Sequence, residues 1–361
     1  MEKKKLFRLL SQRLMYKLAH FFLSKIEPEL AHKLSILGLR AGLHPKIKLK
    51  DNDSLKQIIW GRTFKTPIGL SAGFDKNAEV ISPLFKLGFS YIEVGTVTPL
   101  AQKGNLKPRI FRLKKEKAII NSLGFNNIGL KAVKKNILEK NFNNLFQDRI
   151  LGVNIGNNKN TIEILDDLKV LFENLYSCSD YITVNLSSPN TPGLRDNLKS
   201  NNFEKIVKSI YKLREDNNSK IPILFKISPD ITPEDKKDIA LIALANDVDG
   251  LILTNTTLDR TKLNISLKGG LSGRPLFDKS NELIRDFYAL TSGKIKLIGV
   301  GGIFTSEDIL TKMQYGASLI QLYTSFVYQG PYFIDQLNKD LSQIINELGY
   351  KNISEVIGSM A

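Results

Sequence analysis

A chain of 361 residues with 42% hydrophobic and 24% charged residues has ample apolar material for a core, which excludes a disordered, collagen-like or coiled-coil protein. Its length suits one (β/α)8 barrel with an appendage. The single cysteine, Cys178, excludes a disulfide framework and a cysteine-rich metal site, and it indicates a reducing compartment. The three histidines, His20, His32 and His44, all precede Pro45. We therefore expect no metal site and no imidazole base in the rest of the chain.

Positive charge is concentrated at the start of the chain. The net charge is +16, and residues 1–50 carry twelve Lys/Arg against three Glu. Such a basic segment predicts an appendage that meets an anionic surface, either phospholipid or nucleic acid.

Two amphipathic helices are predicted in this appendage. Residues Met1–Leu23 repeat apolar side chains at helical spacing: Leu6, Phe7, Leu10, Leu14, Leu18, Phe21 and Phe22. Glu27–Gly42 repeats them at Leu30, Leu34 and Leu37. Charges interrupt every apolar run, so neither a transmembrane span nor a secretory signal is predicted. The periodicity alone leaves open a membrane-interface segment, a helical cap on a barrel, or a transit peptide over residues 1–20.

After a predicted hairpin (Ile47–Leu49 with Ile58–Phe64), short apolar runs alternate with helix-length segments. Continuous apolar runs are typical of buried parallel strands. The eight expected strands are Ile68–Ser71, Tyr91–Val94, Leu151–Ile155, Tyr181–Leu186, Ile223–Ile227, Gly250–Thr254, Lys296–Val300 and Ser318–Leu322. Helices are expected at Ala78–Leu87, Thr161–Tyr176, Asn202–Glu215, Pro233–Asn246 and Ser306–Tyr315, and an inserted hairpin around Arg109–Ile120. This order predicts a TIM barrel of the α/β class, without a second large domain.

Polar residues follow every predicted strand, at the barrel end where active sites lie. Glycine pairs before and after the seventh strand (Gly269-Gly270 and Gly301-Gly302), with Tyr323-Thr324 after the eighth, favour a phosphate site over ordinary turns. Lys76 and Lys226, near strand ends, would need an anionic partner there, such as a reduced flavin or a substrate carboxylate. Side-chain amides from Asn121, Asn126, Asn154, Asn185, Asn190 and Asn255 suit a flat heterocycle with alternating N–H and C=O groups.

The motifs at these strand ends resemble one family. The strings SAGFDKNAE, EVGTVTP, NSLGFNN, VNIGNNKNT, VNLSSPNTPGLR, FKISPD, LTNTT, GGLSGRPL, GVGGI and LIQLYTSFVYQGP run in order from about Lys65 to Pro331. Together they resemble the quinone-linked class of dihydroorotate dehydrogenases. The resemblance implies oxidation of (S)-dihydroorotate to orotate in pyrimidine biosynthesis, with one FMN per chain and a membrane quinone as electron acceptor.

The resemblance also implies roles for individual residues. FMN would be bound by Ala72, Gly73, Thr96, Asn154, Asn185, Lys226, Thr254, Gly273, Gly302, Tyr323 and Thr324. Dihydroorotate would be bound by Lys76, Asn121, Ser122, Leu123, Gly124, Phe125, Asn190, Asn255 and Thr256, with Asn185 shared. Ser188 stands at the position of the catalytic base, under a lid from Thr191 to about Ser200 in which Gly193 permits movement.

A serine at position 188 favours the quinone-linked class, because the soluble classes carry a cysteine there. Cys178 lies ten residues upstream and is expected to pack in the preceding helical region. The position of Cys178 also argues against the main alternative function, a tRNA dihydrouridine synthase, because that family uses a cysteine as its catalytic acid. A basic membrane or nucleic-acid adaptor would explain only the first 50 residues.

The resemblance assigns residues 1–45 to a helical extension that forms a quinone tunnel and touches the membrane, and residues 46–361 to an FMN-binding barrel. We therefore expect a monomer that contacts an anionic phospholipid surface and no nucleic acid. The expected location is the cytoplasmic side of a bacterial inner membrane, as a peripheral protein, with the mitochondrial inner membrane as the alternative.

Overall fold

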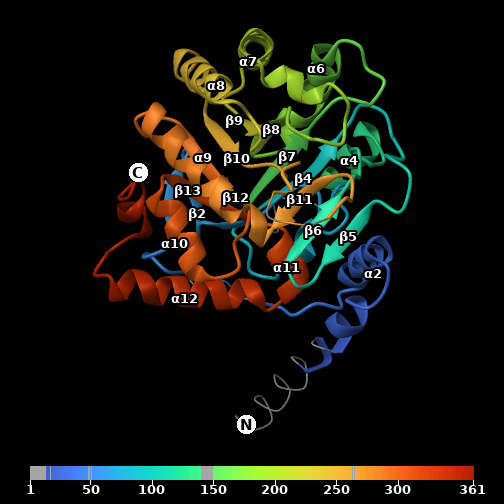
Figure 1. The fold of residues 1–361 in the computed structure, drawn as a ribbon, viewed down its shortest axis with the longest axis vertical. Helices are drawn as coiled ribbons and strands as arrows, with labels where there is room; N and C mark the ends of the chain where they lie inside the picture. The colour runs from blue at the N-terminus through green and yellow to red at the C-terminus, as the bar shows by residue number, and fades with distance from the viewer. Residues whose placement is uncertain are drawn as a thin grey trace.

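A closed barrel of eight parallel strands forms the centre of the structure (Figure 1). The computed structural model describes residues 14–16, 18–47, 49, 51–139, 149–261, 263 and 265–361. Around the barrel the strands are β3 (Ile68–Leu70), β4 (Tyr91–Val97), β7 (Ile150–Ile155), β8 (Tyr181–Asn185), β9 (Ile223–Ile227), β10 (Gly250–Leu253), β12 (Lys296–Val300) and β13 (Ala317–Leu322), and β13 pairs with β3 to close it. All eight predicted strands are present, which confirms the predicted (β/α)8 barrel.

Helices surround the barrel and explain why its strands read as continuous apolar runs. They are α3 (Ile81–Phe85), α4 (Leu130–Glu139), α6 (Ile164–Leu175), α7 (Ser200–Asp216), α8 (Pro233–Ala245), α9 (Phe277–Leu290), α10 (Ser306–Gln314), α11 (Thr324–Gln329) and α12 (Phe333–Glu347). Local signals set their starts: Thr232 caps α8 with Pro233 in its first turn, and Thr305 with Asp308 forms a capping box at α10. Each strand is therefore buried on both faces.

A short hairpin closes the amino-terminal end of the barrel, but not with the predicted strands. β1 (Gln57–Ile59) pairs with β2 (Arg62–Phe64), so both strands come from the segment predicted as one. Trp60 and Gly61 both have positive φ (52° and 69°), as a two-residue hairpin turn requires. Ile47 and Leu49 are not in a strand, so that part of the prediction is wrong. Phe64 instead packs against Tyr91 at the bottom of the barrel.

A three-stranded antiparallel sheet lies over the opposite end of the barrel. It consists of β5 (Ile110–Leu113), β6 (Ala118–Asn121) and β11 (Gly270–Gly273), in the order β11-β6-β5. The predicted inserted hairpin is thus confirmed, and β11 joins it from the loop between β10 and β12. Gly270, which the sequence assigned to a phosphate-type loop, is part of this sheet.

The helices before the barrel turn apolar side chains outward. Residues 14–16 and 18–23 are helical, and α2 (Pro28–Arg40) follows, with Glu27 as its cap and Pro28 in its first turn. Figure 1 shows α2 beside β5. α2 buries Ala31, Ile36 and Leu39 but exposes Leu30, Leu34 and Leu37, and Leu14, Leu18, Phe21 and Phe22 of the preceding helix are exposed too. Leu6, Phe7 and Leu10 lie outside the described residues. In the part of the chain that the structure describes, no helix is long and apolar enough to cross a membrane.

Candidate active site

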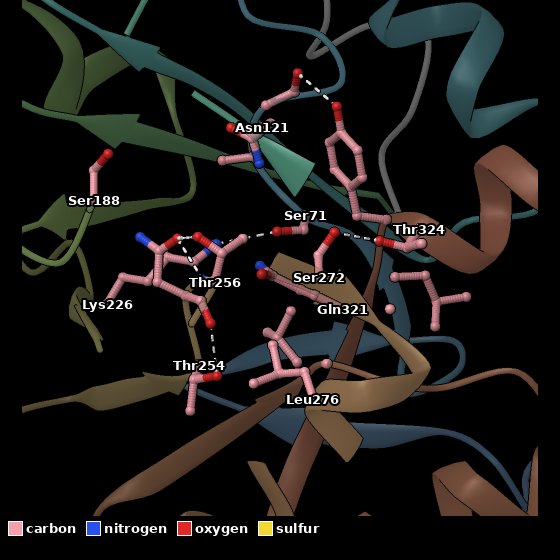
Figure 2. Close-up of a pocket in the computed structure, with 18 of the residues that line it drawn as sticks. Ser71, Asn121, Ser188, Lys226, Thr254, Thr256, Ser272, Leu276, Gln321 and Thr324 are labelled. Carbon is pink, nitrogen blue, oxygen red and sulfur yellow. Dashed lines mark hydrogen bonds between the residues drawn. The ribbon is translucent and has the colours of Figure 1, made fainter. Parts of the chain in front are cut away.

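One pocket lies between the carboxyl ends of the barrel strands and the three-stranded sheet, with an empty volume of about 1040 Å³ including its open mouth (Figure 2). Nineteen of the predicted site residues line it: Ala72, Gly73, Lys76, Thr96, Asn121, Leu123, Gly124, Phe125, Asn185, Ser188, Asn190, Lys226, Thr254, Asn255, Thr256, Gly273, Gly302, Tyr323 and Thr324. The fold therefore brings together residues that the sequence spreads over more than 250 positions.

Two predicted site residues, Asn154 and Ser122, do not line the pocket. Asn154 lies behind the lining and is fully buried. Its Oδ1 accepts hydrogen bonds from Thr96 Oγ1 (2.6 Å) and Asn185 Nδ2 (3.2 Å), both of which face the pocket. Asn154 thus fixes two lining side chains. The backbone carbonyl of Ser122 accepts a hydrogen bond from Asn105 Nδ2.

A buried carboxylate that the sequence analysis missed lies below the pocket. Glu93, in β4, is inaccessible to solvent and accepts hydrogen bonds from Asn154 Nδ2 and Gln321 Nε2 (2.8 Å each), and also from Tyr181 and Thr183. Its charge raises the pKa of both tyrosines that it faces, Tyr91 and Tyr181, in addition to the larger effect of their burial. A single charged residue inside an apolar strand, as in YIEVGT, is the signal that could have identified it.

Lys226 places a positive charge in the wall of the pocket. Its side chain, at the end of β9, is 6% exposed, and its Nζ donates to Ser71 Oγ at 3.1 Å. Burial lowers the pKa of Lys226, and the charge of Glu93 acts in the opposite direction. Buried cations need a nearby anion or acceptor, so this lysine suits an electron-rich ligand.

Gln321 offers an unused acceptor at the same place. Its Nε2 donates to Glu93, and its Oε1 is buried with no hydrogen-bond partner among the described residues, although Gln321 lines the pocket. Buried polar atoms are ordinarily paired, so an orphaned oxygen in a pocket wall indicates a ligand that donates to it.

The glycines after β12 shape one end of the pocket. Gly301 and Gly302 have φ values of 119° and 75°, and a Cβ on Gly302 would lie 2.4 Å from Phe277 Cβ. Only glycine adopts this conformation so close to the start of α9 without strain. Thr324, at the start of α11, lines the same pocket, so the structure brings together the residues after strands seven and eight from which a phosphate site was predicted.

Side-chain amides and hydroxyls form the other end of the pocket. Asn255 Nδ2 donates to Ser187 Oγ (3.0 Å) and Asn185 Oδ1 (3.3 Å), and Asn190 Nδ2 donates to Asn121 Oδ1 (3.3 Å). The predicted base, Ser188, is 6% exposed, and its Oγ accepts the Asn190 backbone N–H at 3.3 Å.

The described residues that line the pocket include no Asp, Glu, His or Cys. Cys178 lies in the 3-10 turn Tyr176–Cys178 after α6, as predicted, with its Sγ toward Leu175 O. The pocket's candidates for proton transfer are therefore hydroxyls and lysines.

Lys76 is the second pocket lysine. Its Nζ donates to Gly73 O at 2.7 Å. Burial lowers the pKa of Lys76 to about 8, an effect that the charge of Glu29 partly offsets and that of Arg109 reinforces. A substrate carboxylate would restore the ordinary preference for the charged form.

An ion pair connects this corner of the pocket to α2. Arg109 donates to both carboxylate oxygens of Glu29 (2.8 and 3.1 Å), and Lys107 adds a third contact at 3.1 Å. Burial by itself would raise the pKa of Glu29, but the hydrogen bonds and charges of Arg109 and Lys107 outweigh it and lower that pKa to about 2. His32, one turn along α2, packs edge-on against Phe74, and burial lowers its pKa to about 3, with help from the charge of Lys76. His32 is therefore neutral at physiological pH.

Comparison with known proteins identifies the family. The family model described as dihydroorotate dehydrogenase matches residues 54–345. The dihydroorotate dehydrogenase (quinone) of Bartonella tribocorum is 43% identical over 91% of this chain and 92% of its own length. The mitochondrial dihydroorotate dehydrogenase (quinone) of Mus musculus is 40% identical over 92% of this chain and 87% of its own. A crystal structure of the DHODH of Eimeria tenella in complex with ferulenol superimposes with a TM-score of 0.88 at 39% identity, covering 92% of this chain and 95% of that one.

The chain belongs to the dihydroorotate dehydrogenase family, whose members are flavin-dependent oxidoreductases. The relatives from Bartonella tribocorum and Mus musculus are both named as quinone-dependent enzymes, so the family and the class inferred from the motifs are confirmed.

Proposed function

We propose that this protein oxidises (S)-dihydroorotate to orotate with bound FMN and passes the electrons to a membrane quinone, as a step of pyrimidine biosynthesis. One observation carries the proposal, which is that the same pocket has two chemically different ends. One end, with Lys226 and the unsatisfied oxygen of Gln321, suits a flavin. The other end, with Ser188 and hydrogen-bonded side-chain amides, suits a small heterocyclic substrate.

The residues present fit FMN. The unpaired Oε1 of Gln321 can accept a ring N–H, and Lys226 can face an electron-rich edge of the ring. The positive-φ glycines after β12 leave backbone N–H groups close to a phosphate. The residues proposed to hold FMN are those inferred from the motifs, with Asn154 acting through Thr96 and Asn185. When bound, FMN would supply the two-electron redox chemistry that links oxidation of dihydroorotate to reduction of the quinone.

The other end of the pocket is proposed to bind dihydroorotate and to remove its C5 proton. The carboxylate pairs with Lys76, and the amides of Asn121, Asn190 and Asn255 bond the ring N–H and C=O groups. Ser188 takes the proton. A serine hydroxyl is a weak base, so its own proton must pass to a water molecule as it takes the C5 proton, and the Asn190 N–H directed at Ser188 Oγ stabilises the oxygen during this exchange.

The helices of residues 1–45 are proposed to serve the second substrate, and residues 46–361 the first. The outward apolar side chains of residues 14–37 suit a lipid interface, where a peripheral protein meets quinone, and the basic charge of residues 1–50 suits anionic phospholipid. We also propose peripheral attachment to the cytoplasmic side of a bacterial inner membrane, and a monomeric protein.

The proposal is tested by an anaerobic titration. The purified protein should show a flavin absorbance band that bleaches on adding dihydroorotate and returns on adding a quinone, but not fumarate or NAD⁺. A colourless protein that does not take up FMN would contradict the cofactor assignment. A yellow protein that dihydroorotate does not bleach would contradict the substrate, and recovery with fumarate or NAD⁺ would contradict the acceptor.

A further inference from the structure

One arginine outside the pocket connects three of the loops that form it. Arg195 lies in the 3-10 helix Leu194–Leu198, in the segment after β8. Its Nε donates to Ser187 O (3.2 Å), its Nη2 to Thr256 O (2.9 Å) and its Nη1 to Asp230 Oδ2 (2.8 Å). These acceptors lie in the loops after β8, β10 and β9, which are neighbouring strands of the barrel.

Two of the three acceptors belong to peptide units that carry pocket residues. The Ser187 carbonyl is part of the peptide that leads directly into Ser188, the proposed base. Thr256 itself lines the pocket at the substrate end. A charge-assisted hydrogen bond to each carbonyl fixes the orientation of its peptide plane. One planar guanidinium therefore sets the base-carrying loop against the substrate-binding loop, and no lysine can span these acceptors in the same way.

The third acceptor keeps Arg195 in place. Asp230 Oδ2 also accepts the Leu258 N–H (2.7 Å), while its Oδ1 accepts from Lys279 Nζ (2.7 Å) and from Thr257 Oγ1. Burial alone would raise the pKa of Asp230, but these hydrogen bonds and that of Arg195 lower it. Asp230 thus remains an anion that anchors the guanidinium from the side away from the two carbonyls.

We infer that Arg195 is a positioning residue for proton abstraction, acting through the Ser187–Ser188 peptide. The inference rests on the proposed role of Ser188. It predicts that a change at Arg195 slows reduction of the flavin by dihydroorotate more than it weakens binding of orotate, because Thr256 is one of several residues proposed to bind the substrate whereas Ser188 is the one proposed base.

The test uses the full-length holoenzyme with Arg195→Gln and Arg195→Lys. Anaerobic stopped-flow mixing gives the rate of flavin reduction, and orotate binding is followed by the shift of the flavin spectrum. A misplacement of about 1 Å costs roughly 10²-fold in rate, so Arg195→Gln should slow reduction by about that factor. Arg195→Lys should recover part of the loss, since it keeps the charge and a donor nitrogen, although not the planar fork. Orotate affinity should change by no more than about threefold, which is under 1 kcal/mol.

Lys279→Gln is the matched control. Lys279 binds the same Asp230 carboxylate as Arg195, and none of its hydrogen bonds reaches Ser187 or Thr256. We expect its reduction rate to stay within about twofold of the parent. An equal loss in Lys279→Gln would overturn the inference, because it would assign the effect to the stability of the Asp230 cluster.

A double variant separates this inference from the function on which it rests. If Arg195 acts through Ser188, adding Arg195→Gln to Ser188→Ala should slow reduction by no more than about twofold further. A full additional loss would show an independent action and overturn the inference. A slow Ser188→Ala enzyme with a parental rate in both Arg195 variants would overturn the inference alone. A parental rate in Ser188→Ala would overturn the role of Ser188 and the inference with it.

Discussion

The barrel mouth and the helices before the barrel break the ordinary rule of burial in opposite directions. In the mouth, polar groups are buried: Asn185, Ser188 and Lys226 are 5–6% exposed. In α2, apolar groups are exposed, with Leu30 at 48% and Leu37 at 55%. Buried polar groups need a polar ligand, and a patch of exposed leucines needs an apolar one. The difference suggests that one molecule serves two substrates of unlike chemistry, a charged heterocycle and a lipid-soluble quinone.

The two regions meet at a small number of polar contacts. On the buried side of α2, Glu29 pairs with Arg109, whose Nη1 also donates to the Lys103 and Asn105 carbonyls. Asn105 in turn donates to Asn190 O at the substrate end. The helix that faces outward is therefore connected, through the side chains of Arg109 and Asn105, to the loop that carries Asn190, which is proposed to bind substrate. A change in either region should affect one half-reaction and spare the other: flavin reduction by dihydroorotate for the barrel mouth, flavin reoxidation by quinone for the helices. A change in the Glu29–Arg109 ion pair should affect the docking of α2 on the barrel.

Replacing the proposed base should give the largest effect, confined to the barrel mouth. General-base catalysis contributes about 10²–10⁴-fold, so Ser188→Ala should slow dihydroorotate-driven flavin reduction by about 10³-fold. FMN content should be unchanged, because the wall formed by Lys226 and Gln321 is intact. Stopped-flow absorbance measures the reduction. Lys76→Met distinguishes the other basic group near substrate, since it should chiefly weaken substrate binding. Parental reduction by Ser188→Ala would show that another group takes the proton.

Removing the charge of Glu29, in the ion pair that connects α2 to the barrel, should have the next largest effect, which is a loss of folding stability. Glu29→Gln leaves Arg109, which is 5% exposed, without its counter-ion, and such a change costs about 3 kcal/mol of the free energy of unfolding. Urea denaturation at pH 7 measures it. Arg40→Gln is the control on the same helix, because the Arg40–Glu79 pair is exposed and should contribute no more than about 1 kcal/mol. Equal losses in the two variants would mean that the buried pair has no special part in docking α2.

The same variant predicts a pH dependence. The folded-state pKa of Glu29 is about 2, below its ordinary value of 4.5. A carboxylate with a lowered pKa stabilises the fold fully above its unfolded pKa, and this contribution is lost as the pH falls through the folded pKa. The difference in unfolding free energy between the parent and Glu29→Gln should therefore be constant above about pH 5 and shrink between pH 4.5 and 2. A difference that grows on acidification would contradict the ion-pair assignment.

The sequence predicted the barrel well because buried parallel strands leave an unambiguous pattern. It failed at the hairpin, where Trp60 and Gly61 form a turn inside the segment predicted as one strand, because tryptophan gives no turn signal. The motifs identified most of the residues that line the pocket. They did not identify Gln321 and Glu93, whose polar side chains lie within apolar strands. They predicted that Asn154 binds FMN, and the structure places it behind the pocket lining, bonded to Thr96 and Asn185.

The contacts of Arg195 illustrate what sequence alone does not provide. Asp230 follows it by 35 residues and Thr256 by 61. Only the closure of the barrel places the ends of β8, β9 and β10 within reach of one guanidinium. The sequence predicted that this segment is a movable lid, because Gly193 permits movement, and that stays a prediction. The hydrogen bonds of Arg195 show a different property, which is that the segment is bonded to the loops after β9 and β10.

The smallest predicted effect concerns the exposed face of α2. Changing Leu30, Leu34 and Leu37 together to glutamine removes apolar contact with lipid but no core packing, so folding stability should change little. Flavin reduction by dihydroorotate should match the parent. Turnover with a quinone embedded in anionic phospholipid vesicles should fall by about tenfold, equivalent to a loss of about 1.4 kcal/mol in interaction with the vesicle. Leu241→Gln, at an even more exposed leucine (63%) of α8 on the outside of the barrel, is the control and should leave vesicle turnover unchanged. If the triple variant kept parental turnover with vesicle-borne quinone, the outward leucines would have no part in reaching the second substrate, and the contrast between the two regions would no longer reflect two substrates.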